Sequence, residues 1–340
     1  MMNKDSLKQD SSITVPNQPL LELKDVKKYF VTEATAFKKK QCIKAVDGFS
    51  LEIQPNQNIG LVGESGCGKS TLGRTILNLH SATDGAVFYK GNRIDNLSFK
   101  QMRPYRREIQ MIFQDPYASL NPRRTIMQSM AEPLELFHLG SREEKREKII
   151  ELLNTVGIGR SHIDKYPHEL SGGQRQRIAI ARSIILNPKF IVADEPVSAL
   201  DVSVRAQVLN LMMQLQEEYN LSYLFISHDL SVVRFLCDKV VVMYLGKIME
   251  IADKHELFDH PTHPYSKALL SAIPIPDVHQ KTKRIILEGD LPSPANPPSG
   301  CVFHTRCHYA AEECRTVCPQ LKTLAEGHQA ACHYAEKLYE

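Results

Sequence analysis

A glycine-rich segment at residues 63–70 constrains this chain more than any other part of its sequence. The segment reads GESGCGKS; it follows the apolar run NIGLV and leads into the helix-like stretch STLGRTILNL. Small residues between a strand and a helix let successive backbone N–H groups close around a phosphate where the helix begins. Such a pattern arises by chance in roughly one chain of this length in a hundred or fewer. The sequence therefore predicts a phosphate-binding loop.

The composition is that of a globular protein with a full hydrophobic core. The chain has 340 residues, of which 42% are hydrophobic, and a formal net charge of +3. That charge is too small for a protein that tracks nucleic acid, and the lysine run at 38–40 is typical of a solvated loop. No window reaches the roughly eighteen apolar residues of a membrane span, and the polar N-terminus lacks a signal-peptide core. We therefore expect membrane contact only through other proteins.

Two later apolar runs predict central strands of a parallel sheet. The run FIVA is followed by Asp194, and the run YLFIS is followed by His228. Strands that are buried on both faces are almost wholly apolar, and open α/β sheets bind ligands at the carboxyl ends of their strands. The sequence therefore predicts an α/β fold whose polar site lies where these strands end.

The polar residues near these strand ends are those that phosphoryl transfer requires. Lys69 would reach the β- and γ-phosphates of a nucleotide, and Ser70 would hold a Mg²⁺ ion. Asp194 would hold the same ion through water, and Glu195 would polarise an attacking water molecule. An acid pair after a strand is by itself often structural, but the upstream phosphate loop favours the catalytic interpretation. We therefore expect a nucleotide-hydrolysing site.

The remaining sequence predicts β segments before this core, a helical insertion within it and a looped region after it. The runs LLELKDV and FSLEI read as β segments, and a polar, basic insertion around 32–41 separates them. From Arg103 to Asn187 the pattern is mainly helical, and Ser141 is a candidate N-cap of a long amphipathic helix. After Leu257 prolines multiply and the periodicity ends, so we expect a separate C-terminal module there.

The pentapeptide LSGGQ at residues 170–174 resembles the signature motif of the ABC ATPase family. It lies between the phosphate loop and the carboxylate pair, in the order found in that family. Ser171 and the N–H groups of Gly172 and Gly173 would open a helix whose positive end faces a γ-phosphate. In the family this phosphate belongs to ATP on the other subunit, so the resemblance implies a head-to-tail dimer.

Four further positions match landmarks of the ABC ATPases in order along the chain. Gln114 resembles the Q-loop glutamine that senses Mg²⁺ and water. Asp201 resembles the D-loop aspartate that couples the two sites, although it is also a candidate N-cap of the following helix. His228 resembles the switch histidine that contacts the γ-phosphate. Phe30 is the candidate for stacking on adenine, with Tyr29 as the second choice and core packing as the alternative.

The resemblance assigns residues to three roles at an ATP site. The catalytic residues are Glu195, His228 and Gln114. The nucleotide-binding residues are Phe30, Gly63, Ser65, Gly66, Cys67, Gly68, Lys69, Ser70, Thr71, Gln114, Ser171, Gly172, Gly173, Gln174, Asp194 and Asp201. The Mg²⁺ ligands are Ser70, Gln114 and Asp194. The cofactors that the resemblance implies here are ATP and Mg²⁺.

The resemblance covers about Leu20 to Gly246. It implies the P-loop NTPase fold of ABC ATPases, with a RecA-like parallel sheet core, an antiparallel β subdomain and a helical subdomain at about 116–187. We expect a disordered tail over 1–19, an ATPase domain over 20–256 and a small cysteine-rich module over 257–340.

Strings outside the catalytic motifs resemble the peptide-importer subfamily, and its dipeptide members most closely. They include QDPYASLNPR, HPYSKALLSA and LPSPANPPSGC. Subunits of this type pair with a second, non-identical ATPase, two membrane permeases and a periplasmic or extracellular substrate-binding protein. The resemblance therefore implies an importer motor at the cytoplasmic face of the cell membrane, bound there as a peripheral subunit. Other subunits select the cargo, so a dipeptide, an oligopeptide or another solute stays open.

Five of the eight cysteines lie between Cys301 and Cys332. In a reducing cytosol a dense cysteine group more often holds a metal than disulfides. Cys301, Cys307, Cys314 and Cys332 resemble the C-terminal pattern of peptide-importer ATPases, in which four thiolates hold a [4Fe–4S] cluster. Zn²⁺ is the first alternative, although the short Cys-x₂₋₄-Cys knuckle is missing, and free thiols are the second. Cys318 is an alternative to Cys314 as the third ligand.

Two other functions compete with the importer motor or add to it. A soluble ABC ATPase acting on ribosomes or DNA usually carries two motor cassettes or a long coiled coil, and this sequence has neither. A redox-responsive regulator would use the cysteine segment to change ATP hydrolysis, which is compatible with a motor. We therefore expect the importer motor, with no nucleic-acid partner.

Overall fold

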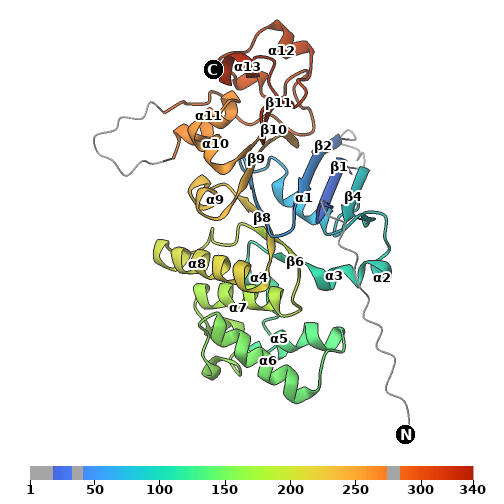
Figure 1. Cartoon of the computed structure of the whole chain (residues 1–340), viewed down its shortest axis with the longest axis vertical. Helices are drawn as coiled ribbons and strands as arrows, with labels where there is room; N and C mark the ends of the chain where they lie inside the picture. The colour runs from blue at the N-terminus through green and yellow to red at the C-terminus, as the bar shows by residue number, and fades with distance from the viewer. Residues whose placement is uncertain (1–17, 33–40, 274–283, 340) are drawn as a thin grey trace, which may run out of the picture.

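The computed structural model describes residues 18–32, 41–273 and 284–339. Nearly all of the predicted N-terminal tail and the whole lysine run at 38–40 lie outside these residues. Figure 1 shows an elongated molecule, with the helical insertion at one end and the C-terminal segment at the other.

An eight-stranded mixed sheet forms the centre of the fold, in the order β11-β12-β10-β9-β3-β8-β7-β6. Its strands are β3 (Asn58–Val62), β6 (Ile109–Ile112), β7 (Phe190–Asp194), β8 (Ser222–Ser227), β9 (Lys239–Tyr244), β10 (Lys247–Asp253), β11 (Lys322–Ala325) and β12 (His328–Ala330). The strands from β9 to β6 are parallel, and β3, β7 and β8 are wholly buried. The predicted parallel core is confirmed, and its carboxyl ends meet at one edge.

A four-stranded antiparallel sheet, in the order β2-β1-β4-β5, packs beside the main sheet. Its strands are β1 (Leu21–Thr32), β2 (Gln41–Ile53), β4 (Asp84–Tyr89) and β5 (Asn92–Arg93). The first two are longer than the predicted β segments, because the ladder between them continues as far as Thr32 opposite Gln41. The added residues, 27–32 and 41–48, mix charged, polar and apolar side chains without strict alternation, and most are half-buried or exposed, so the sequence pattern did not reveal them.

Helices cover both faces of the main sheet and form the insertion. The helices before and within the insertion are α1 (Lys69–Ile76), α2 (Phe99–Met102), α3 (Tyr105–Glu108), α4 (Pro116–Ser119), α5 (Ile126–Leu136), α6 (Arg142–Thr155) and α7 (Gly172–Ile184). Those after it are α8 (Val202–Tyr219), α9 (Leu230–Leu236), α10 (Lys254–Asp259), α11 (Pro264–Ser271), α12 (Glu312–Thr316) and α13 (Ala335–Tyr339). The predicted N-cap of α6 is confirmed, since Ser141 and Glu144 form a reciprocal capping box.

The C-terminal segment continues the main sheet. Strand β12 pairs with β10 in antiparallel register, with Ala330 opposite Glu250 and Gln329 opposite Ile251. Val302 and Phe303 are buried in the same hydrophobic core as strands of the main sheet. Residues far beyond the phosphate loop in sequence are therefore packed against the structure that carries it.

A buried ion pair anchors β12 to β10. His328 Nε2 lies 2.7 Å from Glu250 Oε1, and both side chains are fully buried. Glu250 also accepts hydrogen bonds from the backbone N–H groups of Thr262 and His263. Burial lowers the pKa of His328, but the carboxylates of Glu250 and Glu256 outweigh burial and leave that pKa raised. The folded chain therefore favours the imidazolium form of this histidine.

Replacing His328 with Leu is expected to lower the free energy of unfolding by about 3 kcal/mol at pH 6, because it leaves a buried carboxylate without its cation. A raised folded pKa gives stability that is complete below the unfolded pKa of about 6.5 and is lost as the pH rises through the folded pKa. The difference between wild type and variant should therefore shrink between pH 6 and pH 9. Thermal and urea unfolding at both pH values would measure it, and a constant difference would contradict the ion pair.

Candidate active site

The phosphate loop joins β3 to α1, as the sequence predicts. Two of its glycines have no room for a side chain: a Cβ on Gly63 would lie 2.2 Å from the Met243 carbonyl oxygen, and one on Gly68 would lie 2.0 Å from that of Ala45. Gly68 also has a φ of +108°, which other residues rarely adopt. These contacts let the loop pack tightly while its N–H groups stay at the start of α1.

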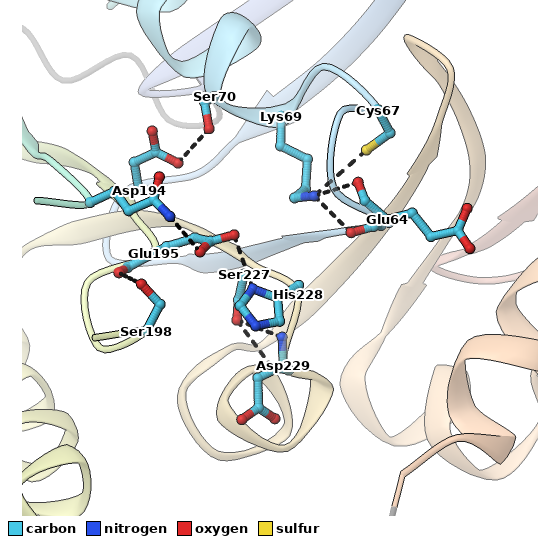
Figure 2. A network of polar contacts seen from close by, with 12 residues as sticks. Glu64, Cys67, Lys69, Ser70, Asp194, Glu195, Ser198, Ser227, His228 and Asp229 are labelled. Atoms are coloured by element: carbon cyan, nitrogen blue, oxygen red, sulfur yellow. Dashed lines mark hydrogen bonds and ion pairs between the residues drawn. The ribbon is translucent and has the colours of Figure 1, made fainter. Parts of the chain in front are cut away.

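Lys69 is buried beneath this loop, and its ammonium group hydrogen-bonds to the loop (Figure 2). Its Nζ donates to the carbonyl oxygens of Gly63 at 2.7 Å and Glu64 at 2.9 Å. A cation held by two carbonyls is already positioned for the phosphates that the loop would bind. Cys67 lies beside it, and burial raises the pKa of its thiol, so it acts as a neutral small side chain.

Two oxygen ligands suited to Mg²⁺ face each other at the end of β7. Ser70 Oγ donates to Asp194 Oδ1 at 2.8 Å (Figure 2). Burial raises the pKa of Asp194, although the hydrogen bond from Ser70 opposes that rise. Hydroxyl and carboxylate oxygens at the phosphate loop are the donors that Mg²⁺ prefers in nucleotide sites, so this pair fits the ion.

Glu195 stands between two polar residues from neighbouring strand ends. Its Oε2 accepts a hydrogen bond from Gln114 Nε2 at 3.0 Å, and its Oε1 lies 3.0 Å from His228 Nδ1. Glu195 has a φ of +47°, and its N–H donates to the Ile226 carbonyl at 2.9 Å. A non-glycine residue held at positive φ marks a position whose geometry the surroundings impose. The structure thus brings the three predicted catalytic residues together.

The signature segment forms the start of α7. Ser171 caps this helix in a reciprocal capping box: its Oγ accepts from the Gln174 N–H, and its N–H donates to Gln174 Oε1. A Cβ on Gly172 would meet nothing within 4 Å, so the positive end of α7 is open on this side. In Figure 1 this helix lies apart from α1 and the phosphate loop. The structure therefore does not bring the signature residues to the loop of the same chain.

Asp201 and Phe30 are both exposed to solvent. Asp201 Oδ1 accepts from the Val204 N–H at 3.0 Å, so its predicted role as the N-cap of α8 is confirmed. Phe30, near the end of β1, packs edge-on against the His80 ring and is partly exposed. Tyr29 is less available, since its hydroxyl donates to Asp47.

The C-terminal cysteines separate into two groups. Cys301, Cys307, Cys314 and Cys332 line one small cavity. Cys318 does not line it: this thiol is exposed and faces the carbonyl of the following proline. Burial raises the pKa of Cys301 to about 12 and of Cys307 to about 11, and neighbouring cysteines add to both shifts. Among the described residues, no three His, Cys, Asp or Glu side chains are placed to hold a single metal ion.

An apolar groove lies between β6 and the insertion, beside Gln114. Three large apolar side chains on its lining are unusually exposed: Phe99 at 76%, Phe113 at 38% and Leu136 at 55%. Isolated exposed apolar residues are ordinary, but several on one concave surface indicate a binding surface. The sequence pattern did not identify this groove, because its residues come from four separate segments.

Sequence reasoning also missed a contact between the phosphate loop and the C-terminal segment. Arg306 forms an ion pair with Glu64 of the loop, and the Tyr265 hydroxyl accepts from the Glu64 N–H at 2.8 Å. These partners lie more than two hundred positions from Glu64, and no periodic pattern links residues at that separation.

The chain is similar to known transporter subunits along most of its length. Residues 46–198 match the family described as ABC transporter, and residues 249–314 match the oligopeptide/dipeptide transporter C-terminal region. The oligopeptide transport ATP-binding protein AppF of Bacillus subtilis is 55% identical over 94% of this chain and 99% of its own. The dipeptide transport ATP-binding protein DppF of Haemophilus influenzae is 50% identical over 94% of this chain and 98% of its own.

A solved structure of similar fold contains ADP and inorganic phosphate, the products of ATP hydrolysis. The dimeric ATP-binding cassette MJ0796 bound to ADP and Pi is 29% identical, with a TM-score of 0.62 over 69% of this chain and 98% of its own. Within the described residues of the present chain, no helix is long and apolar enough to cross a membrane. The chain is therefore an ATP-hydrolysing subunit of the ABC transporter family, and its C-terminal region is that of the oligopeptide/dipeptide transporters.

Proposed function

We propose that this chain powers the uptake of short peptides from the cytoplasmic face of the cell membrane, where it is a peripheral subunit. The observation that carries the proposal is the similarity to peptide transport subunits over 94% of the chain, including the C-terminal region. Both the ATP site and the region beyond it match, and the second of these is specific to peptide transporters. Other subunits select the cargo, so the similarity of that region to peptide transporters, rather than the ATP site, is what supports peptides as the cargo.

ATP is bound and hydrolysed at the end of the parallel strands. The loop N–H groups and Lys69 bind the phosphates, while Ser70, Asp194 and Gln114 hold Mg²⁺. When bound, Mg²⁺ neutralises charge that develops on the phosphates. Glu195 orients the attacking water and accepts its proton, with its carboxylate fixed by Gln114 and His228. His228, which is largely exposed, is free to contact the γ-phosphate once Glu195 turns to the water.

The second half of each ATP site comes from another subunit. The open start of α7 offers Ser171, Gly172, Gly173 and the neighbouring Gln174 to the γ-phosphate of ATP bound on a partner. Asp201, the N-cap of α8, couples the two sites in this proposal, and Phe30 stacks on adenine. In peptide importers of this kind the partner is a non-identical ATPase, so we propose a heterodimer.

The apolar groove beside Gln114 is the surface for a membrane permease. Phe99, Phe113 and Leu136 leave a large apolar surface open in a protein that carries no membrane helix among its described residues. A short amphipathic helix of a permease fits such a groove. Phe113 precedes Gln114 directly, so a partner in the groove contacts the segment that positions Glu195.

Uptake of labelled peptides tests this proposal. In a strain that lacks this gene, the accumulation of labelled dipeptides and tetrapeptides should fall and return with the wild-type gene, whereas uptake of a free amino acid should not change. The length series decides between dipeptides and longer peptides as cargo. Native mass spectrometry of the membrane complex should find one copy of this chain per complex. Unchanged peptide uptake in the deletion strain would refute the cargo, and two copies would refute the heterodimer.

We also propose that the cysteine cavity holds a [4Fe–4S] cluster, with Zn²⁺ as the alternative. A cubane cluster binds each thiolate through a different iron atom, so its ligands surround a volume rather than one point. Four cysteines line one small cavity, which matches that arrangement in the number of thiolates. Protein purified without air should contain about four iron atoms and about four acid-labile sulfides per chain. About one zinc and no sulfide would assign the cavity to Zn²⁺ instead.

A further inference from the structure

The cysteine-rich segment reaches into the phosphate loop through one arginine. Arg306 Nη1 donates to Glu64 Oε2 at 2.6 Å, and Nη2 donates to Glu64 Oε1 at 3.1 Å. The arginine side chain is only 8% exposed. A bidentate guanidinium–carboxylate pair is stronger and more directional than a single hydrogen bond, and partial burial shields it from solvent. This contact therefore fixes the Glu64 side chain in one position.

Glu64 is held from three directions at once. Besides the ion pair, its backbone N–H donates to Tyr265 Oη at 2.8 Å, and its carbonyl oxygen accepts from Lys69 Nζ at 2.9 Å. Tyr265 is fully buried and packs against Phe303, which precedes Arg306 by three positions. The lysine that would bind phosphate and the arginine of the C-terminal segment thus meet on one residue of the loop.

The turns that carry two cavity cysteines also carry Arg306. The short 3₁₀ helix His304–Arg306 lies between Cys301 and Cys307. The Arg306 N–H donates to the Phe303 carbonyl at 3.0 Å, and the Cys301 N–H donates to the Cys314 carbonyl at 2.8 Å. A change in the spacing of these cysteines would therefore move the guanidinium and, through it, Glu64.

We propose that Arg306 is a positioning residue for ATP binding, because it holds the phosphate loop in the conformation that binds phosphate. The arrangement of the cavity cysteines determines the position of the Arg306 guanidinium. The proposal rests on ATP binding at this loop, and it requires neither a peptide cargo nor a particular ligand in the cavity. Without the ion pair, Glu64 loses its anchor and the loop populates other shapes. The apparent dissociation constant for ATP then equals the intrinsic constant divided by the fraction of molecules whose loop can still bind, so it rises as that fraction falls.

Calorimetric binding of a non-hydrolysable MgATP analogue to the full-length chain tests this role. Arg306→Gln and Glu64→Gln should each raise the Kd about five- to tenfold, and Arg306→Lys should restore part of the loss because it keeps the charge. The Kd of the Arg306→Gln/Glu64→Gln double variant should not exceed the higher of the two single-variant Kd values, because both changes remove the same ion pair. Arg315→Gln is the matched control, since Arg315 is exposed and lies 3.9 Å from its partner Glu312. Its Kd should not change.

A cavity variant tests the second half of the proposal. Cys307→Ala should raise the Kd in the wild-type background and add nothing in the Arg306→Gln background, whereas Cys318→Ala, outside the cavity, should have no effect in either. Additive effects of Cys307→Ala and Arg306→Gln would overturn the link through Arg306.

Two outcomes would overturn the positioning role. One is an unchanged Kd in a folded Arg306→Gln variant, and the other is additive losses in the double variant. If Arg306→Gln does not fold, Glu64→Gln decides, because it removes the same pair from within the loop. Wild-type protein that does not bind the analogue would instead refute the ATP site itself, so the two failures are distinguishable.

Discussion

Replacing Glu195 with Gln is expected to reduce ATP turnover by two to four orders of magnitude while MgATP binding stays within about threefold of wild type. Removal of a general base typically costs a factor of 10² to 10⁴ in rate. Glu195 is the carboxylate that stands between Gln114 and His228, and an amide of the same shape has no comparable basicity. Phosphate release by the assembled transporter measures kcat, and calorimetry measures binding.

The structure explains why this substitution should separate chemistry from binding. Of the residues proposed to hold the phosphates and Mg²⁺, Lys69, Ser70 and Asp194 do not hydrogen-bond through their side chains to the Glu195 carboxylate within the described structure. Gln114 does, but the amide oxygen of a glutamine at position 195 can accept the same hydrogen bond. Their positions should survive the change, so the variant should accumulate as an ATP-bound form. By mass action, such a form should also be harder to unfold at saturating ATP.

A matched control and one contrary outcome complete this test. Glu217→Gln makes the same chemical change at an exposed position on α8, and its turnover should equal that of wild type. Turnover of Glu195→Gln within tenfold of wild type would refute the assignment of Glu195 as the base. A loss of binding as large as the loss of turnover would instead place this residue in nucleotide binding.

Most of the arrangement at the candidate ATP site could be predicted because its parts are tied to local patterns. The phosphate loop is a contiguous motif, and the residues after apolar runs lie at the carboxyl ends of strands. Parallel strands place those ends at one edge, which is why Gln114, Glu195 and His228 meet although they come from β6, β7 and β8. Local sequence and the rule for parallel sheets were sufficient here.

The contacts that could not be predicted are those between distant segments with no shared pattern. The Arg306–Glu64 pair joins residues 242 positions apart, and the His328–Glu250 pair depends on β12 adding to β10. A cysteine-rich loop with many prolines gives no periodicity from which to place a strand or an arginine. Only the folded chain shows that this region continues the main sheet and touches the phosphate loop.

The choice between Cys314 and Cys318 shows the same limit on a smaller scale. The two thiols are four positions apart, a spacing that puts side chains on one face of a continuous helix. Helix α12 ends at Thr316, however, and Cys318 precedes a proline beyond it. Cys314 therefore lines the cavity with Cys301, whereas the Cys318 thiol points to the surface.

If the cavity holds the proposed [4Fe–4S] cluster, Cys314→Ser is expected to abolish the iron and sulfide content of anaerobically purified protein, whereas Cys318→Ser is expected to retain both. A serine hydroxyl is a hard, poorly acidic donor, so it does not replace a soft thiolate at an iron–sulfur core. Burial raises the pKa of the cavity thiols Cys301 and Cys307, so without a bound cation they stay protonated near neutral pH. The three remaining thiols, of which Cys301 is buried and the other two are half-buried, should not retain the cluster when the fourth ligand is lost.

The pair of variants distinguishes Cys314 from Cys318 as a ligand, and the metal content distinguishes iron from zinc. Loss of iron in Cys318→Ser with retention in Cys314→Ser would make Cys318 the ligand and would require α12 to rearrange around it. A third outcome is that wild type and both variants lack iron, that wild type and Cys318→Ser contain about one zinc, and that Cys314→Ser has lost it. The cavity thiols would then form a zinc site. Both proteins keep Arg306 and Glu64, so their MgATP affinities also report whether an emptied cavity still positions the phosphate loop. A cluster that only stabilises the fold would leave those affinities equal, whereas a cavity that sets Arg306 would weaken binding in Cys314→Ser alone.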